Sequence, residues 1–160
     1  MKNKLIYLIG SLRNPSVPAV ANELRDMGFN VYDDWHAVGP HADDYWRAYE
    51  KGRGHTMQQA LEGKAARNVF NFDLRWLSAA SAVVLLTPAG KSAHLELGWC
   101  LGRKVPGFIY MPEGEDDPDR WDVMYQFATR VVTNITDLVD NIQTVLDSAE
   151  ARGRHEQTSV

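Results

Sequence analysis

The chain has 160 residues, of which 44% are hydrophobic and 24% are charged, which suits one globular domain with a real core and leaves no room for a second. A net charge of -4, with no cluster of Lys and Arg, argues against binding to polymeric nucleic acid. The single cysteine, Cys100, cannot form an internal disulfide, and the apolar stretch near the N-terminus is too short for a signal peptide or a membrane span. We therefore expect a cytoplasmic protein with no membrane attachment.

The first third of the chain predicts a strand, a helix and a second strand. Residues 4–9 form a continuous apolar run, typical of a buried strand that leads into a loop. After two prolines, apolar residues at helical spacing predict a helix over 20–27 that ends at Gly28, followed by a short strand over 30–32. The polar, aromatic and glycine-interrupted segment 33–63 predicts a loop or lid followed by a helix.

The rest of the chain continues the alternation of strands and helices. In chain order we expect a helix over 65–80, a strand over 81–87, a helix over 92–102, strands over 105–110 and 128–132, and a helix over 135–148. Residues 1–150 then form the domain, and residues 151–160 form a flexible tail.

Alternating strands and helices predict an α/β fold, a flavodoxin- or Rossmann-like three-layer sandwich with a mostly parallel five-stranded sheet. In such folds ligands bind beyond the carboxyl ends of the strands. The loops expected there are 10–14, 33–41 and 88–92.

Glu96 is the first candidate for chemistry. One face of its helix is an apolar stripe formed by Ala93, Leu97, Cys100 and Leu101. Glu96 and Ser92 share another face, directed toward the strand ends. A surface carboxylate usually has Lys or Arg three or four residues away, and Glu96 has none, which favours a functional role over a solvated one. Ser92 is either a ligand contact or the N-cap of the helix.

Asp73 is the second candidate, because it falls in a row of otherwise apolar residues at helical spacing: Ala66, Phe70, Asp73, Leu77 and Ala80. A carboxylate in such a row faces a core or a cleft, and burial without a counter-charge raises its pKa. The alternative is an aspartate that accepts hydrogen bonds from backbone amides of a nearby loop.

The segment Gly10 to Asn14 offers a close backbone approach, a hydroxyl (Ser11) and a guanidinium (Arg13) directly after the first strand. This combination suits a phosphate, although an ordinary loop has the same composition. Four aromatic residues could stack on a base or could simply pack, namely Trp35, Tyr45, Trp46 and Tyr49. The spacing of His36, His41, Asp43 and Asp44 matches no familiar metal site, so we expect neither a metal nor another cofactor.

Three segments together resemble the nucleoside 2-deoxyribosyltransferases and the related 2′-deoxynucleoside 5′-monophosphate N-glycosidases. These are YLIGSLR, FDLRWLSAASAVVLL and PAGKSAHLELGWCLGRKVPGFIY, and the likeness spans residues 5–110. The resemblance implies that Glu96 is the nucleophile, that Asp73 assists at the base and sugar, and that Tyr7 orients the nucleophile. It also implies a homodimer or larger homo-oligomer in which subunits complete each other's sites.

One departure from the transferase pattern bears on the substrate. Transferases of free nucleosides usually carry an aspartate six residues before the nucleophile, where this chain has Gly90. GSLR is similar to the phosphate-binding segment of the monophosphate glycosidases, which implies that Ser11, Arg13 and Ser92 contact a phosphate. The candidate substrate-binding residues are Gly10, Ser11, Arg13, Asp34, Trp35, Gly90, Ser92 and His94.

The resulting hypothesis is cleavage of the N-glycosidic bond of a nucleoside or its 5′-monophosphate through a covalent sugar ester on Glu96, with transfer to water or to another base. Two alternatives remain open. One is a glycohydrolase of NAD-type dinucleotides, and the other is a nucleotide-binding sensor without catalysis.

Overall fold

The computed structural model describes residues 4–112 and 118–157. Its centre is one sheet of five strands in the order β2-β1-β3-β4-β5, and every neighbouring pair is parallel. The strands are β1 (Leu5–Ile9), β2 (Asn30–Tyr32), β3 (Ala82–Leu86), β4 (Gly107–Tyr110) and β5 (Arg130–Val132). This order and pairing are those of the flavodoxin-like doubly wound fold, so the predicted fold class is confirmed.

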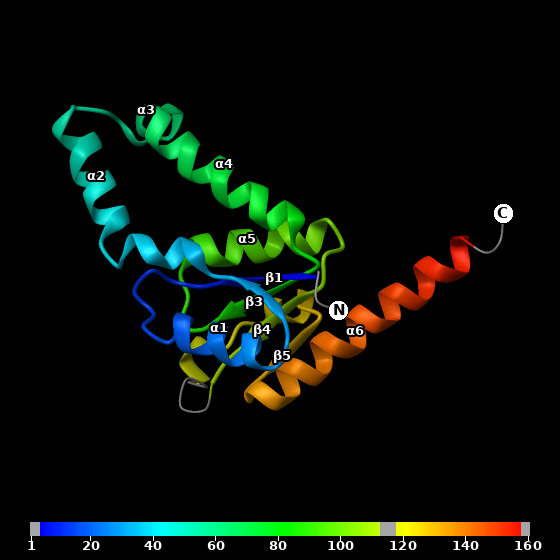
Figure 1. Ribbon diagram of the computed structural model, residues 1–160. Helices are drawn as coiled ribbons and strands as arrows, with labels where there is room; N and C mark the ends of the chain where they lie inside the picture. The colour runs from blue at the N-terminus through cyan, green and yellow to red at the C-terminus, as the bar shows by residue number, and fades with distance from the viewer. Residues whose placement is uncertain (1–3, 113–117, 158–160) are drawn as a thin grey trace.

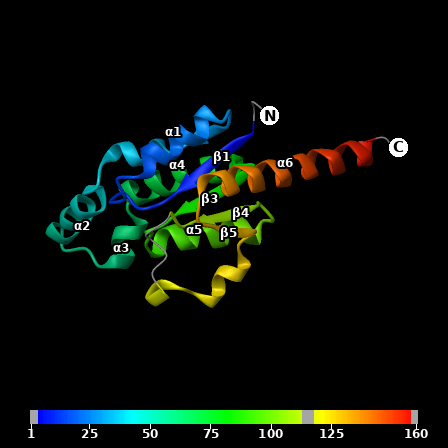
Figure 2. The same ribbon diagram turned by 90° about the horizontal axis from the view of Figure 1, so that it is seen from below.

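Helices cover both faces of the sheet (Figure 1), with α1 and α6 on one face and α4 and α5 on the other. Their bounds are α1 (Val17–Asp26), α2 (Ala42–Gly52), α3 (Met57–Glu62), α4 (Lys64–Ala79), α5 (Lys91–Gly102) and α6 (Ile135–Gln157). Three 3-10 helices complete the fold, namely η1 (Asp34–Val38), η2 (Pro118–Arg120) and η3 (Val123–Phe127). Both views show α2 and α3 projecting beyond the sheet (Figures 1 and 2). No helix among the described residues is long and apolar enough to cross a membrane.

Alternate residues of each strand enter two different cores. In β1, Ile6 and Leu8 pack under α1 and α6, whereas Tyr7 and Ile9 pack under α4 and α5. This follows from the two-residue period of a strand, and burial on both faces explains why β1 and β3 are apolar throughout.

The predicted helix starts and ends need three corrections. Helix α1 begins at Val17 rather than residue 20, because Pro18 lies in the first turn, where a missing N–H costs nothing. Segment 33–63 holds η1, α2 and α3 rather than a loop or lid before one helix. Helix α6 continues to Gln157, so residues 151–157 of the predicted tail are helical, while residues 158–160 lie outside the described part.

Candidate functional site

The three predicted catalytic residues lie on one face of the sheet. Asp73 lies on α4, Glu96 on α5 and Tyr7 on β1, an inner strand between β2 and β3. Glu96 and Asp73 are close enough for the charge of Asp73 to raise the pKa of Glu96, and both charges raise the pKa of Tyr7. Carboxylates from two different helices, α4 and α5, therefore lie within electrostatic reach of one another.

Burial is the main cause of the altered acidity of this group. It raises the pKa of Glu96 to about 7, with the Asp73 charge as a second cause, and it raises the pKa of Asp73. Within residues 4–112 and 118–157, neither carboxylate takes part in a hydrogen bond that would favour its charged form. The alternative that Asp73 binds backbone amides of a loop is thus wrong. The pair is poised to hold a proton near neutral pH.

An aromatic stack that the sequence did not single out borders the carboxylates. Tyr7 and Tyr32 are aligned on neighbouring strands with ring centroids 5.2 Å apart, and Trp76 stacks on Tyr32 at 4.5 Å. The Tyr32 hydroxyl and the Trp76 indole N–H are buried and have no hydrogen-bond partner among the residues that the structure describes. Burial, followed by the charge of Asp73, raises the pKa of Tyr32 to about 12. Trp76 lies three residues after Asp73, and this spacing was the available signal.

Two further predictions about these helices have clear outcomes. Cys100 is fully buried in the core as expected, and burial together with the Glu96 charge raises its thiol pKa to about 11. Phe70, placed by its spacing on a core-facing row, is 63% exposed. The reason is that only the C-terminal part of α4, from Asp73 to Leu77, lies against the domain, whereas its N-terminal part extends outward with α3 (Figure 1).

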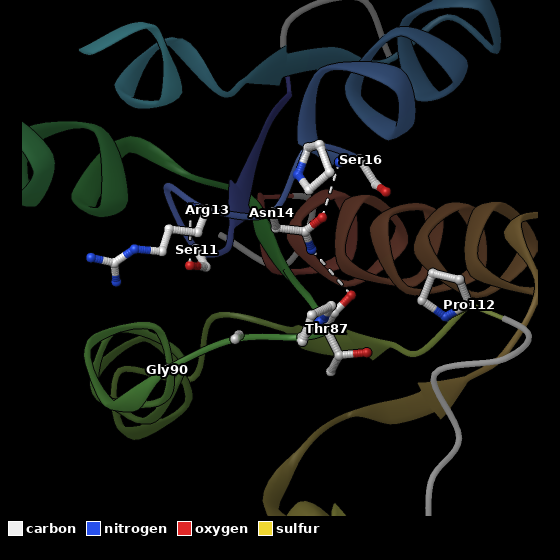
Figure 3. Close-up of a pocket in the computed structure, with 10 residues that line it drawn as sticks. Ser11, Arg13, Asn14, Ser16, Thr87, Gly90 and Pro112 are labelled. Carbon is white, nitrogen blue, oxygen red and sulfur yellow. Dashed lines mark hydrogen bonds between the residues drawn. The ribbon is translucent and has the colours of Figure 1, made fainter. Parts of the chain in front are cut away.

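A second feature is a pocket of about 560 Å³ beyond the carboxyl ends of β1, β3 and β4 (Figure 3). Its lining comprises Ser11, Arg13, Asn14, Pro15, Ser16, Thr87, Pro88, Ala89, Gly90 and Pro112. The structure therefore brings three of the predicted binding residues, Ser11, Arg13 and Gly90, to one pocket. We call it the strand-end pocket.

Asn14, which the sequence analysis did not propose, holds the two main loops of this pocket together. It is 4% exposed, and its amide nitrogen donates to the Thr87 carbonyl at 3.2 Å. Its side-chain oxygen accepts from the Ser16 backbone N–H at 3.0 Å. The Ser11 hydroxyl oxygen accepts from the Arg13 backbone N–H at 3.2 Å, so it acts as a turn-forming group in this structure.

The Gly10 prediction of close approach has a specific explanation. A Cβ at Gly10 would lie 3.2 Å from the Val17 side chain and 3.4 Å from the Trp35 ring. The groups that approach Gly10 closely are therefore side chains of the protein. The indole of Trp35 donates to the Leu8 carbonyl at 2.8 Å and contacts both cores. Trp35 is therefore a packing residue in this structure. Asp34 is exposed beside it, and its charge contributes to the raised pKa of Tyr32.

Ser92 and His94 are absent from the lining of the strand-end pocket. Ser92 is exposed in the first turn of α5, whose N-cap is Gly90, so the N-cap alternative for Ser92 is wrong. The His94 ring lies 2.7 Å from the Gly90 carbonyl through Nδ1 and 3.2 Å from the Tyr125 hydroxyl through Nε2. It lines a separate hollow between α5 and η3.

No protein-family model and no curated protein matches the chain. Among solved structures, it is similar to the crystal structure of a conserved protein from Enterococcus faecalis V583, with 13% sequence identity and a TM-score of 0.58. The similarity covers 88% of this chain and 98% of that one. A likeness at this identity supports the three-layer α/β fold and leaves the chemistry to be argued from the residues.

Two histidines in the segment after β2 contact other groups of the protein. The His36 ring contacts the Asn14 carbonyl at 3.1 Å, and His41 contacts Asp44 at 3.3 Å. Among the described residues, no group of three or more His, Cys, Asp or Glu side chains could hold a metal ion. The described residues thus offer two partly buried carboxylates with raised pKa values and a pocket at the strand ends.

Proposed function

We propose that the protein cleaves the N-glycosidic bond of a nucleoside 5′-monophosphate or nucleoside through a covalent sugar ester on Glu96. The observation that carries the proposal is the placement of Glu96 beside Asp73, both partly buried and both without a hydrogen bond from the described residues. Burial of unpaired carboxylates opposes folding, so their presence in place of apolar residues favours a catalytic role.

The two raised pKa values suit a pair that shares one proton. Two neighbouring carboxylates resist ionising together, so one ionised and one protonated group coexist near neutral pH. In the proposed first step, ionised Glu96 attacks the anomeric carbon while the bond to the base breaks. The bonding electrons leave with the base, which takes the proton of Asp73.

The second step regenerates the enzyme. Asp73, now ionised, removes a proton from water as the water oxygen attacks the anomeric carbon, and the ester bond to Glu96 breaks. When a second base attacks in place of water, the outcome is transfer. Tyr7 is buried within electrostatic reach of both carboxylates and is the proposed positioning residue for Glu96.

The strand-end pocket is the proposed site for the 5′ end of the substrate. It offers Ser11 and Arg13 on one wall and the open backbone of Gly90 on the other. An arginine suits a phosphate, and the absence of a carboxylate at Gly90 removes a repulsive charge from a phosphorylated ligand. A 5′-monophosphate is therefore the favoured substrate.

A 2-fluorinated nucleotide analogue tests the nucleophile, because fluorine slows release of the sugar ester and lets it accumulate. Mass spectrometry of the digested protein should find the sugar on the peptide that contains Glu96, and Glu96→Ala should carry none. A sugar on any other residue, or an adduct on Glu96→Ala, would show that the assignment is wrong.

A substrate screen separates the alternatives. Nucleosides and their 5′-monophosphates are incubated with and without an acceptor base, and the released base is measured. Release from a monophosphate supports the proposal, and release of nicotinamide from NAD alone favours the dinucleotide glycohydrolase. Thermal stabilisation by nucleotides without turnover favours a sensor.

The proposed assembly is a homodimer or larger homo-oligomer. Its support is the set of exposed apolar side chains on α3 and α4, namely Met57, Leu61, Val69, Phe70 and Phe72. Sedimentation equilibrium of the wild type should give a multiple of the 18.0 kDa mass of one chain. Phe70→Asp should lower the measured mass toward that of one chain. A wild-type protein that sediments at the chain mass would refute the assembly.

A further inference from the structure

Arg13 lines the strand-end pocket, yet its guanidinium is bound elsewhere. Its Nη2 donates to both carboxylate oxygens of Asp44, on α2, at 2.9 and 2.8 Å. Figure 3 shows the Arg13 side chain extending away from Asn14 and Thr87. The arginine is thus part of the pocket by position while its charge is held outside it.

The remaining polar groups of the pocket offer an anion little. Arg13 is the only cationic residue among the described residues that line it. The Asn14 amide donates a hydrogen bond to the Thr87 carbonyl, and the Thr87 hydroxyl donates one to the Tyr110 carbonyl at 3.3 Å. An anion bound in this pocket therefore gains a cationic partner from the lining only if the Arg13 guanidinium turns inward.

Asp44 is the group that opposes this movement. In addition to Arg13, it accepts hydrogen bonds from Arg47 and lies 3.3 Å from the His41 ring. These three neighbours, Arg13 foremost, lower the pKa of Asp44 to about 2, so it stays ionised throughout the physiological pH range. Protonation does not release Arg13, whereas a competing anion can.

We infer that Asp44 tunes the affinity of the pocket for phosphate by competing with the ligand for Arg13: a phosphate draws the guanidinium into the pocket at the cost of this ion pair, and a neutral nucleoside leaves the ion pair in place. The inference rests on the proposed function, in which the strand-end pocket receives the 5′ end of the substrate. A phosphate dianion presents three acceptor oxygens to the guanidinium, which lets it replace a carboxylate as partner. A nucleoside 5′-hydroxyl lacks the charge to do so.

The cost of this competition to phosphate binding can be estimated. An exposed ion pair such as Arg13 with Asp44 contributes little, so releasing Arg13 should strengthen phosphate binding by only about twofold to fivefold. Arg47 and His41 remain near Asp44 when Arg13 leaves, which keeps the carboxylate paired and makes the exchange feasible.

Calorimetric titration of four proteins with inorganic phosphate, a 2′-deoxynucleoside 5′-monophosphate and the matching nucleoside tests the inference. The proteins are the wild type, Asp44→Asn, Asp43→Asn and the double variant Asp44→Asn with Arg13→Ala. Asp43 is the matched control, because it is an exposed acidic residue on the same turn of α2 and is not among the hydrogen-bond or ion-pair partners of Arg13 in the described residues. It separates release of Arg13 from the general effect of removing one negative charge.

We expect Asp44→Asn to bind phosphate and the monophosphate about twofold to fivefold more tightly than both the wild type and Asp43→Asn, with nucleoside binding unchanged. The double variant should lose this gain. Equal binding by Asp44→Asn and Asp43→Asn, weaker binding by Asp44→Asn, a gain that survives Arg13→Ala, or no phosphate binding by any protein would each overturn the inference.

Base release measured on the same proteins keeps the two proposals distinct. Turnover of the monophosphate combined with equal binding by the two asparagine variants refutes the role of Asp44 and leaves the proposed function standing. The expected binding pattern without any turnover refutes the glycosidase and supports the competition for Arg13.

Discussion

The two faces of the sheet use their buried residues differently. Under α1 and α6 the core is aliphatic except for Phe108 and Tyr110, and it includes fully buried Ile6, Leu8 and Ile142. Under α4 and α5 the core contains tyrosines and Cys100 and is bordered by Asp73 and Glu96. Neighbouring residues of one strand thus serve opposite faces, and one face holds groups that oppose folding.

This division explains how the fold holds the carboxylates without losing its stability. Apolar burial on the α1 and α6 face supplies a stabilising free energy that the other face does not need to match. The α4 and α5 face holds carboxylates and polar groups that have no hydrogen-bond partner in the described part of the chain, and such departures from optimal packing occur at functional sites. Variants on the two faces should therefore separate activity from stability.

Glu96→Gln should have the largest effect. The amide keeps the size of the side chain and cannot attack the sugar, so turnover should fall on the order of 10⁴-fold or more. The free energy of unfolding should not fall, because a partly buried charge is removed. Base release per folded molecule, with folding checked by circular dichroism, measures both. A loss below about tenfold would contradict the role of Glu96 as nucleophile.

Asp73→Asn should lower turnover by about 10²- to 10⁴-fold, because the leaving base loses its proton donor. It should also change the pH profile of the residual activity. The active state of the wild type has Glu96 ionised and Asp73 protonated, so its activity should fall at high pH when the pair loses the shared proton. Asparagine cannot lose this proton, so the falling limb should be absent in Asp73→Asn. A falling limb that persists unchanged in this variant would contradict the role of Asp73 as proton donor.

Leu8→Ala and Tyr7→Phe compare adjacent residues that face opposite sides. Leu8 is fully buried on the aliphatic face, and its truncation should lower the free energy of unfolding by about 2–5 kcal/mol without changing kcat per folded molecule. Tyr7→Phe removes one hydroxyl, so it should change stability by about 1 kcal/mol or less while lowering kcat. Urea unfolding and turnover are measured on both variants. A fall in kcat for Leu8→Ala would show that the faces do not act separately.

The fold was predictable from β1 and β3, because a strand buried on both faces must be apolar throughout and its five-residue length limits the alternatives. Helix α3 was missed although Thr56 and Gln59 form a capping box at its start. That signal is local and strong, and it was hidden by the glycines on either side.

The candidate site was predictable where a residue breaks a local pattern. Glu96 lacks a helical counter-charge and Asp73 interrupts an apolar row, so each is visible in the sequence. Tyr32 and the pairing of Arg13 with Asp44 depend on contacts between distant segments, and no periodicity encodes them. Phe70 shows the converse, because its spacing predicts burial and only the tertiary arrangement of α4 reveals its exposure.

The smallest expected effect concerns stability and pH. Glu96 has its pKa raised from 4.5 to about 7 in the folded protein, so between these values the folded state binds more protons than the unfolded state. Stability contributed by this group is therefore lost as pH rises from 4.5 to 7, by up to about 3 kcal/mol. Asp44 acts in the opposite direction and only in strong acid, since its pKa is lowered to about 2.

Urea unfolding of the wild type and Glu96→Gln at pH values from 4.5 to 8 isolates this contribution, because the two proteins differ only at residue 96 and the comparison is a difference between them. Glu96→Gln should gain on the wild type steadily as pH rises and should keep the full gain at pH 8. Leu8→Ala is the control from the other face, since it should lower the whole curve without changing its slope. If the free energy of unfolding of Glu96→Gln changed with pH as steeply as that of the wild type, the wild-type Glu96 carboxylate would be solvated like a surface group. The proposed contrast between the two faces of the sheet would then be wrong for Glu96.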